Sequence, residues 1–76
     1  FIGVNVSQAT TLTLPLNSPI GTNYIIKDTS GNASSNNITI AAQSPNTIEG
    51  ASTTTINTNH GLKKLIYDGS SKWFFI

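Results

Sequence analysis

Apolar residues recur at every second position along most of this chain, which is the spacing of β-strands with one buried face. In residues 11–16 the leucines fall on one face and the threonines on the other, until Pro15 removes a backbone donor and marks a strand end or edge. The same alternation and the β-branched content predict short strands at residues 24–28, 37–40, 47–49, 52–57, 62–67 and 73–76. Val4 and Val6 alternate over a shorter stretch, so we expect residues 1–9 to be an arm, a linker or a short strand that pairs elsewhere. Residues 10–76 are expected to form a single β domain.

Turn-forming residues separate the predicted strands. Asp28 opens the sequence Asp-Thr-Ser-Gly-Asn, where its carboxylate is expected to accept N–H bonds from residues two positions on. Gly31 or Asn32 can take a positive φ in this turn. The pair Asp68-Gly69 is the strongest hairpin signal in the chain, and it predicts that residues 62–67 turn back onto residues 73–76.

The expected fold is all-β, with short antiparallel strands and hairpins in a small sandwich or prism. The chain has 76 residues, 37% of them hydrophobic, and domains of about this size often need extra support to be stable. With no Cys and one His, neither disulfides nor a metal centre can supply it, so we expect the chain to associate with other chains and to share a core with them. The last predicted strand is apolar on both faces, which also suggests that another chain packs on it. The residues expected to point into this assembly core are Leu12, Leu14, Ile26, Ile38, Ile40, Ile48, Ile56, Leu65, Ile66, Trp73 and Phe74.

The chain carries little charge, with a formal net charge of +1 at pH 7 and 9% charged residues. Its four lysines are too few and too scattered for a basic stripe, so nucleic acid is not an expected partner. The longest apolar run, residues 73–76, is far shorter than the roughly 20 residues of a membrane-spanning helix, and no membrane insertion is expected. The 11 Thr, 9 Ser and 9 Asn give a surface that does not titrate, which suits a virion surface or another extracellular location. Because the chain opens on Phe1 rather than Met, we expect a processed chain or a fragment of a longer one.

No group of residues predicts catalysis, a cofactor or a metal site. His60 is the single imidazole and has no Cys, second His or carboxylate near it in the sequence, so a loop role is expected. The carboxylates Asp28, Glu49 and Asp68 each lie at a turn or strand end, where accepting backbone N–H bonds explains them. The sequence contains no Gly-x-Ser-x-Gly elbow and no Gly-rich phosphate loop, so the chain is not expected to be an enzyme.

Three aromatic residues, Tyr24, Tyr67 and Trp73, suggest an alternative binding role. Amphipathic aromatics beside Asn and Asp are what sugar-binding surfaces use to stack on a pyranose ring. Packing in the core or in a subunit interface is the other expectation for these residues. Sequons for N-glycosylation begin at three asparagines, Asn5, Asn32 and Asn37. A chain so rich in Asn, Ser and Thr contains about this many by chance, so the use of these sequons stays open.

An ordered set of short segments also resembles a known kind of module. The set comprises Leu-Thr-Leu-Pro at residues 12–15, residues 21–24, 26–28 and 31–33, Asn-Ile-Thr-Ile at 37–40, Thr-Ile-Glu-Gly at 47–50, Ile56, Gly61, residues 65–67, Gly69 and Trp73. It resembles a small module of structural proteins in bacteriophages and large DNA viruses, usually in tail-fibre or capsid-fibre-like chains. The resemblance covers residues 12–76 and implies a non-enzymatic, all-β building block, commonly trimeric, that serves as shaft, trimerisation unit or receptor-facing knob. Glu49 departs from the Asp that such chains often carry, and Phe74-Phe75 is bulkier than their usual end.

Three functions of different classes are therefore expected. The first is a structural module of a virion fibre that acts in host attachment and shares its core between copies. The second is a carbohydrate-binding module for a host-surface glycan, with Trp73, Tyr67 or Tyr24 as the stacking platform. The third is an extracellular filament subunit, in which residues 1–6 or the C-terminal strand complete the sheet of a neighbouring copy by edge addition.

Overall fold

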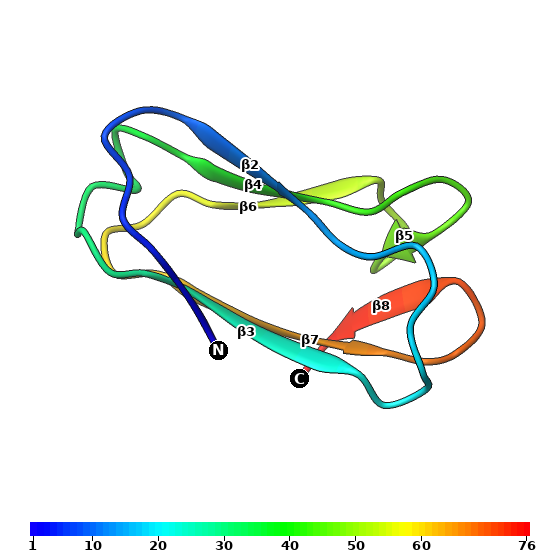
Figure 1. The fold of residues 1–76 in the computed structure, drawn as a ribbon. Helices are drawn as coiled ribbons and strands as arrows, with labels where there is room; N and C mark the ends of the chain where they lie inside the picture. The colour runs from blue at the N-terminus through cyan, green and yellow to red at the C-terminus, as the bar shows by residue number, and fades with distance from the viewer.

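The computed structural model describes residues 1–76 and contains eight β-strands. They are β1 (Ile2–Val4), β2 (Thr10–Thr13), β3 (Asn23–Asp28), β4 (Ile38–Ala41), β5 (Thr47–Ile48), β6 (Thr53–Ile56), β7 (Leu62–Tyr67) and β8 (Lys72–Phe75). Five strands form one sheet in the order β1-β3-β7-β8-β5, and three form a second sheet in the order β2-β4-β6. The sheets lie one above the other as two layers (Figure 1). The all-β prediction is confirmed, and each predicted strand is present with ends that differ by a few residues.

Successive strands alternate between the two sheets from β1 to β7, so each of these connections crosses from one layer to the other. A chain that returns to a sheet by way of the other layer can run in the same direction as its neighbour. Three of the strand pairs are accordingly parallel: β1 with β3, β2 with β4, and β5 with β8. The prediction of antiparallel strands joined by hairpins is wrong for these pairs. It is confirmed for β7 and β8, which form the hairpin predicted at Asp68-Gly69, with Gly69 at a φ of 82°.

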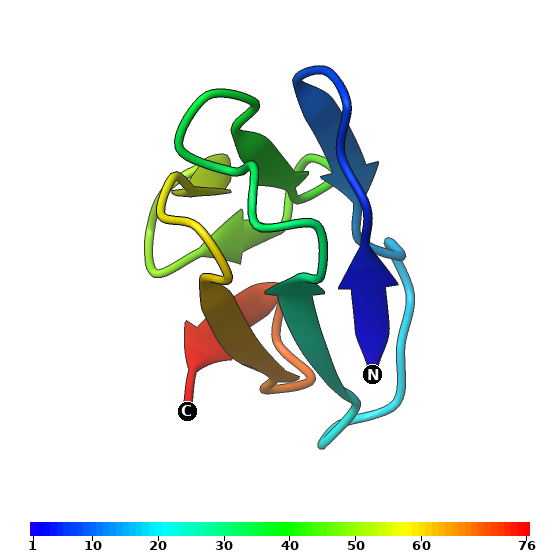
Figure 2. The same ribbon diagram turned by 90° about the vertical axis from the view of Figure 1, so that its left-hand side faces the viewer.

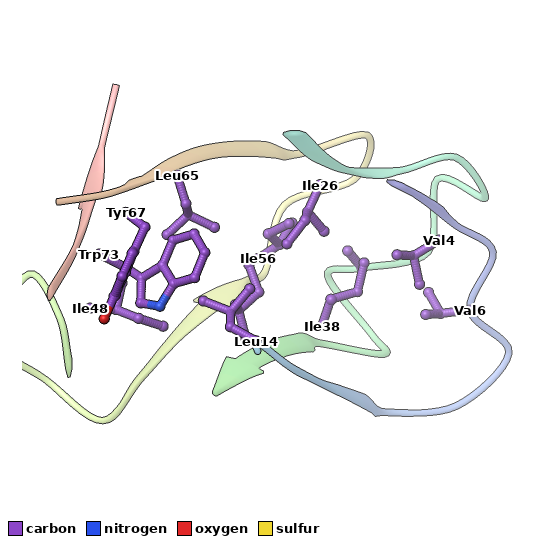
Figure 3. Packing of buried hydrophobic residues seen from close by; sticks show 12 residues of the cluster. Val4, Val6, Leu14, Ile26, Ile38, Ile48, Ile56, Leu65, Tyr67 and Trp73 are labelled. Atoms are coloured by element: carbon purple, nitrogen blue, oxygen red, sulfur yellow. The ribbon is translucent and has the colours of Figure 1, made fainter. Parts of the chain in front are cut away.

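A single hydrophobic core fills the space between the sheets (Figure 3). Its 12 buried residues are Val4, Val6, Leu14, Ile26, Ala33, Ile38, Ile40, Ile48, Ile56, Leu65, Tyr67 and Trp73. The pleat of the strands selects them: in β4, for example, Ile38 and Ile40 are buried while the residues between and after them are half-buried. The core extends from Trp73 at one end to Val4 and Val6 at the other (Figure 3). Strands of one chain are sufficient to close it.

Residues 1–9 belong to this unit rather than to a separate arm. β1 lies beside β3 in parallel register, with Ile2 opposite Ile26 (Figure 2). The N–H of Thr29 donates to the carbonyl of Val4 at 2.9 Å, which continues the pairing past the end of β1. Burial of Val4 and Val6 in the core fixes the segment in place. The boundary predicted between residues 9 and 10 therefore does not separate two structural units.

Most residues predicted for the assembly core are buried within the single chain. These are Leu14, Ile26, Ile38, Ile40, Ile48, Ile56, Leu65 and Trp73. Leu12 is half-buried and packs against them. Ile66 and Phe74 require a correction, because Ile66 is half-buried and Phe74 is 38% exposed. The pleat turns Tyr67 and Trp73 inward, so the residues that alternate with them lie on the outer face of the sheet.

Candidate functional site

A buried carboxylate organises one corner of the molecule, where the connections that follow β1, β3 and β6 meet. Asp28, the last residue of β3, has no exposed surface. Its Oδ1 accepts hydrogen bonds from the Ser30 N–H (3.0 Å), the Ser30 hydroxyl (2.6 Å) and the Gly31 N–H (3.1 Å). Its Oδ2 accepts from the N–H groups of Ala33 and His60, both at 3.0 Å. The turn predicted around Asp28 is confirmed, and His60 links it to the connection between β6 and β7.

Two further hydrogen bonds fasten the neighbouring connections to this corner. The side-chain amide of Asn32 donates to the carbonyl of Val6 at 3.4 Å. The N–H of Ser34 donates to the side-chain oxygen of Asn59 at 3.0 Å. The polar residues at this end therefore join three chain segments that are far apart in the sequence.

The same hydrogen bonds determine the charge of Asp28. Burial by itself raises the pKa of a carboxyl group. Here the Ser30 hydroxyl and the N–H groups of His60, Ala33 and Ser30 outweigh burial and hold the pKa of Asp28 well below its ordinary value. The side chain is thus a carboxylate at all but strongly acidic pH, and N–H and O–H donors satisfy its oxygens.

Asp28, Ser30 and His60 are the residue types of a hydrolytic triad, but they do not have its geometry. A triad needs the imidazole between the hydroxyl and the carboxylate. Here the Ser30 hydroxyl donates directly to Asp28, and His60 reaches Asp28 through its backbone N–H. The imidazole lies against Gly31 instead, so closely that a Cβ on Gly31 would stand 2.7 Å from His60 Nε2. The arrangement stabilises the corner and does not activate a nucleophile.

The other two carboxylates also accept backbone N–H bonds, as predicted. Asp68 Oδ1 accepts from the N–H groups of Ser70 and Lys72 and shapes the hairpin turn. Glu49 Oε2 accepts from the Phe75 N–H at 2.9 Å. Because β5 has only two residues, the Glu49 carboxylate takes the place of the carbonyl that a longer strand would offer to β8. Nowhere in the structure do three or more His, Cys, Asp or Glu side chains gather in a way that could hold a metal ion.

The structure brings the three predicted aromatic residues together at one end of the core. The ring centroid of Trp73 lies 5.7 Å from that of Tyr24 and 5.0 Å from that of Tyr67. Trp73 has no exposed surface, Tyr67 is 7% exposed, and only Tyr24 is half-buried. The rings of Trp73 and Tyr67 lie side by side among the core residues (Figure 3). Trp73 and Tyr67 therefore have no free ring face for a sugar, and core packing is the role that the structure shows for them. The Tyr67 hydroxyl accepts from the Ser71 N–H, whereas the indole nitrogen of Trp73 is buried with no hydrogen-bond partner.

The outer face of the five-stranded sheet carries apolar residues that are exposed or half-buried. The register places Ile66 beside Phe74, and Ile25 lies on the same face of β3, so these three residues define an outer apolar face. Leu62 extends this face along β7 and is 45% exposed. Three lysines alternate with these residues on the same side of the sheet: Lys27, Lys64 and Lys72.

A groove of about 400 Å³ lies where β8 ends beside β7. It is lined by Leu62, Lys63, Lys64, Phe75 and Ile76. Leu62, Phe75 and Ile76 are 45%, 41% and 66% exposed, respectively. The ammonium of Lys63 lies 4.8 Å from the centroid of the Phe75 ring, a cation–π contact. The groove therefore combines apolar walls with two cationic side chains.

Comparison with known proteins adds no family to these observations. Neither the models of known protein families nor the curated proteins contain a match to this chain. The resemblance to viral fibre modules stays a prediction from the sequence.

The structure has no helix that could cross a membrane. Three asparagines that begin sequons have exposed side chains: Asn5, Asn32 and Asn37.

Sequence reasoning missed the groove and the partners of two carboxylates. The bonds from His60 to Asp28 and from Phe75 to Glu49 join residues 32 and 26 positions apart, and no local pattern signals them. The groove depends on the register of β7 and β8. One sequence signal could have indicated an unusual surface at the groove: residues 62–67 carry both apolar and lysine residues on each face. A strand of a two-layer sandwich usually has one apolar and one polar face.

Proposed function

We propose that this chain is a non-enzymatic structural module of a virion fibre or similar extracellular appendage, which serves as shaft, trimerisation unit or receptor-facing knob. The observation that carries the proposal is the outer apolar face formed by Ile25, Ile66 and Phe74. Large apolar side chains grouped on an exposed sheet are typical of a surface that packs against another chain. The proposed partner is a second and third copy of the same chain, in a homotrimer.

The polar residues support a structural rather than a catalytic role. Asp28, Glu49 and Asp68 all accept backbone N–H bonds that hold turns or strand ends. Since the fold uses these carboxylates to complete its own hydrogen bonding, they are not presented to a substrate. A surface of Thr, Ser and Asn with few charges suits a building block that must tolerate changing surroundings.

The proposed association takes place at a surface and not through a shared core. The core of 12 residues is closed by one chain, and Ile40 within it has no exposed surface. A charged residue at such a core position, for example Ile40→Asp, would unfold the chain and could not test assembly separately from folding. Phe74, at 38% exposed, is the better position to change.

The test compares two serine variants of exposed apolar residues by light scattering on a sizing column. Phe74→Ser removes the centre of the outer apolar face, whereas Ile20→Ser removes a residue that is 78% exposed in the connection between β2 and β3. We expect native protein and Ile20→Ser to have roughly three times the mass of the 8.0 kDa chain, and Phe74→Ser to be a folded monomer.

Three results would contradict the proposal. If the native protein were monomeric at all concentrations, self-assembly through this face would be ruled out. An equal loss of mass in both variants would show that the face has no special part in assembly. Regular filaments in the void volume would favour the strand-addition alternative, in which copies join edge to edge.

A further inference from the structure

The outer face of the three-stranded sheet, the upper layer in Figure 1, is built almost entirely of threonine. The apolar residues of β2, β4 and β6 point to the core, so the residues that alternate with them point outward. These six outward residues, which we call the threonine face, are Thr11, Thr13, Thr39, Ala41, Thr53 and Thr55. Three of them are exposed and the other three are half-buried.

The pairing of the strands arranges the threonine face in two rows. Thr11 lies opposite Thr39, and Thr39 lies opposite Thr55, so each strand contributes one residue to the first row. The second row consists of Thr13, Ala41 and Thr53. Neighbouring strands lie about 4.7–4.9 Å apart, and alternate residues of one strand lie about 6.6–6.8 Å apart, so the face is a two-dimensional grid. Twist accumulates from strand to strand, so this sheet departs less from a plane than the five-stranded sheet does.

Strand propensity alone does not explain this selection of residues. Threonine is favoured at half-exposed strand positions in general. The outer face of the five-stranded sheet nevertheless carries large apolar residues and lysines, and its only strand threonine is Thr47 in the short edge strand β5. The strands β2, β4 and β6 contain no charged residue. The molecule therefore has one apolar and cationic face and one uncharged face of hydroxyl groups.

The hydroxyl groups of the threonine face are available to water. The threonine hydroxyls that donate hydrogen bonds within the protein are those of Thr10 and Thr22, and neither residue belongs to the face. A hydroxyl group donates and accepts hydrogen bonds, as a water molecule does. Because threonine is branched at Cβ, few χ1 rotamers are open to it, so the backbone grid restricts where the hydroxyl and methyl groups lie.

The threonine face lacks the groups that other kinds of partner require. Protein partners are anchored mainly by aromatic and arginine side chains, sugars by aromatic rings, and nucleic acids by cations. None of these groups occurs among the six residues. The face offers instead a repeat of hydroxyl and methyl groups, and its two spacings are close to repeat distances between oxygen atoms in hexagonal ice.

We infer that the threonine face binds ice, because its grid holds water molecules in positions that match the ice lattice and so attaches the protein to a growing crystal. The ligand is thus an ordered layer of water and not a protein, sugar or nucleic acid. The inference does not rest on the proposed fibre function, since it uses the outer face of the three-stranded sheet and not the outer apolar face.

The test measures how much protein enters ice that grows slowly on a cooled probe in a solution of the 76-residue chain. A solute without affinity for ice is excluded from the crystal, so the ratio of protein in ice to protein in the liquid, read from tryptophan absorbance, reports binding. Thr11→Lys and Thr13→Lys each place a charge on the face at an exposed position. We expect each to lower the ratio at least about tenfold, because the ammonium would lose its water against the crystal without gaining a partner. The two variants are separate, and the urea midpoint of each shows that it is folded.

Thr47→Lys is the matched control. It makes the same substitution at a half-buried threonine on the outer face of the other sheet, so the added charge is equal but lies away from the threonine face. We expect this variant to change the ratio less than about twofold. Phe74→Ser separates the inference from the proposed function, because it is expected to lose self-association and still enter ice.

Three outcomes would overturn the inference. Exclusion of the native chain from ice as complete as that of Thr13→Lys would show that the face does not bind ice. An equal loss in Thr47→Lys would mean that added charge acts regardless of its position. A lower mass of Thr13→Lys by light scattering, with an unchanged ratio of protein in ice, would show that a second copy of the chain covers the face.

Discussion

At the scale of single residues, Asp28 is where stability should depend on pH. Its pKa is held well below the ordinary value in the folded protein and returns to about 3.9 in the unfolded chain. Below about pH 4 the unfolded chain takes up a proton that the folded protein does not, so the contribution of Asp28 is complete at neutral pH and is lost on acidification. We expect the urea midpoint, measured by circular dichroism, to fall steadily from about pH 4 to about pH 2.

Asp28→Asn is the control for this prediction. An amide keeps the size of the side chain but has one acceptor oxygen in place of two, and its own N–H groups would face the donors that now bind the carboxylate. The variant should have a lower urea midpoint at pH 7 and a shallower loss below pH 4. If its midpoint fell as steeply as that of the native protein, the acid sensitivity would belong to Glu49 or Asp68.

Trp73 combines the largest buried side chain with an unsatisfied donor. Replacing it by Phe removes ring volume from the core, but it also removes an indole N–H that is buried without a partner. Since an unsatisfied buried donor costs about 1–3 kcal/mol, the two effects offset each other in part. We expect Trp73→Phe to lower the free energy of unfolding by about 1–2 kcal/mol, against about 3–5 kcal/mol for Trp73→Ala. Urea unfolding that gave the two variants equal losses would mean that the indole nitrogen makes a stabilising interaction.

At the scale of elements, the strands were predictable because their signals are local. The alternation in residues 37–40 and the Asp68-Gly69 turn need only neighbouring residues, and both predictions are confirmed. The pairing partners were not predictable in this way. Ile2 pairs with Ile26, and Thr10 pairs with Ile38, because the chain crosses to the other sheet and back between them. Such pairings depend on how the whole core closes.

The candidate sites were likewise predictable only where their residues are close together in the sequence. The turn at Asp28 was predicted because Ser30 and Gly31 follow it directly. The fifth hydrogen bond to Asp28 comes from His60, which lies in a different connection. For Trp73 and Tyr67, the residue types alone do not distinguish two roles, because amphipathic aromatic side chains suit both a sugar-binding platform and a core. Only the inward direction of the pleat in β7 and β8 decides between the two.

Loss of β1 should destabilise the whole domain. Deleting residues 1–9 removes Val4 and Val6 from the core and exposes the edge of β3. Their burial contributes about 2–4 kcal/mol, a large part of the total stability of about 5 kcal/mol that suits so small a domain. We therefore expect the truncated chain to be largely unfolded by circular dichroism and amide NMR. The filament hypothesis gives a different expectation: if residues 1–6 complete the sheet of a neighbouring copy, the rest of the chain should keep its fold without them.

A double substitution in the same segment controls for the length of the N-terminus. Ser7 and Gln8 are exposed, so replacing both by Ala leaves β1 and its two valines in place. This variant is expected to keep the native urea midpoint. A truncated chain with an equally native midpoint would show that β1 adds little to the stability of the sandwich.

At the scale of the whole molecule, the stability of the fold should depend little on salt. The fold is held by a core of 12 apolar residues and by carboxylates bound to backbone N–H groups, in a chain with 9% charged residues. Its urea midpoint should therefore change little between about 0.05 and 0.5 M NaCl. A urea midpoint that changed strongly over this range would mean that exposed charges, and not the core, contribute most of the stability.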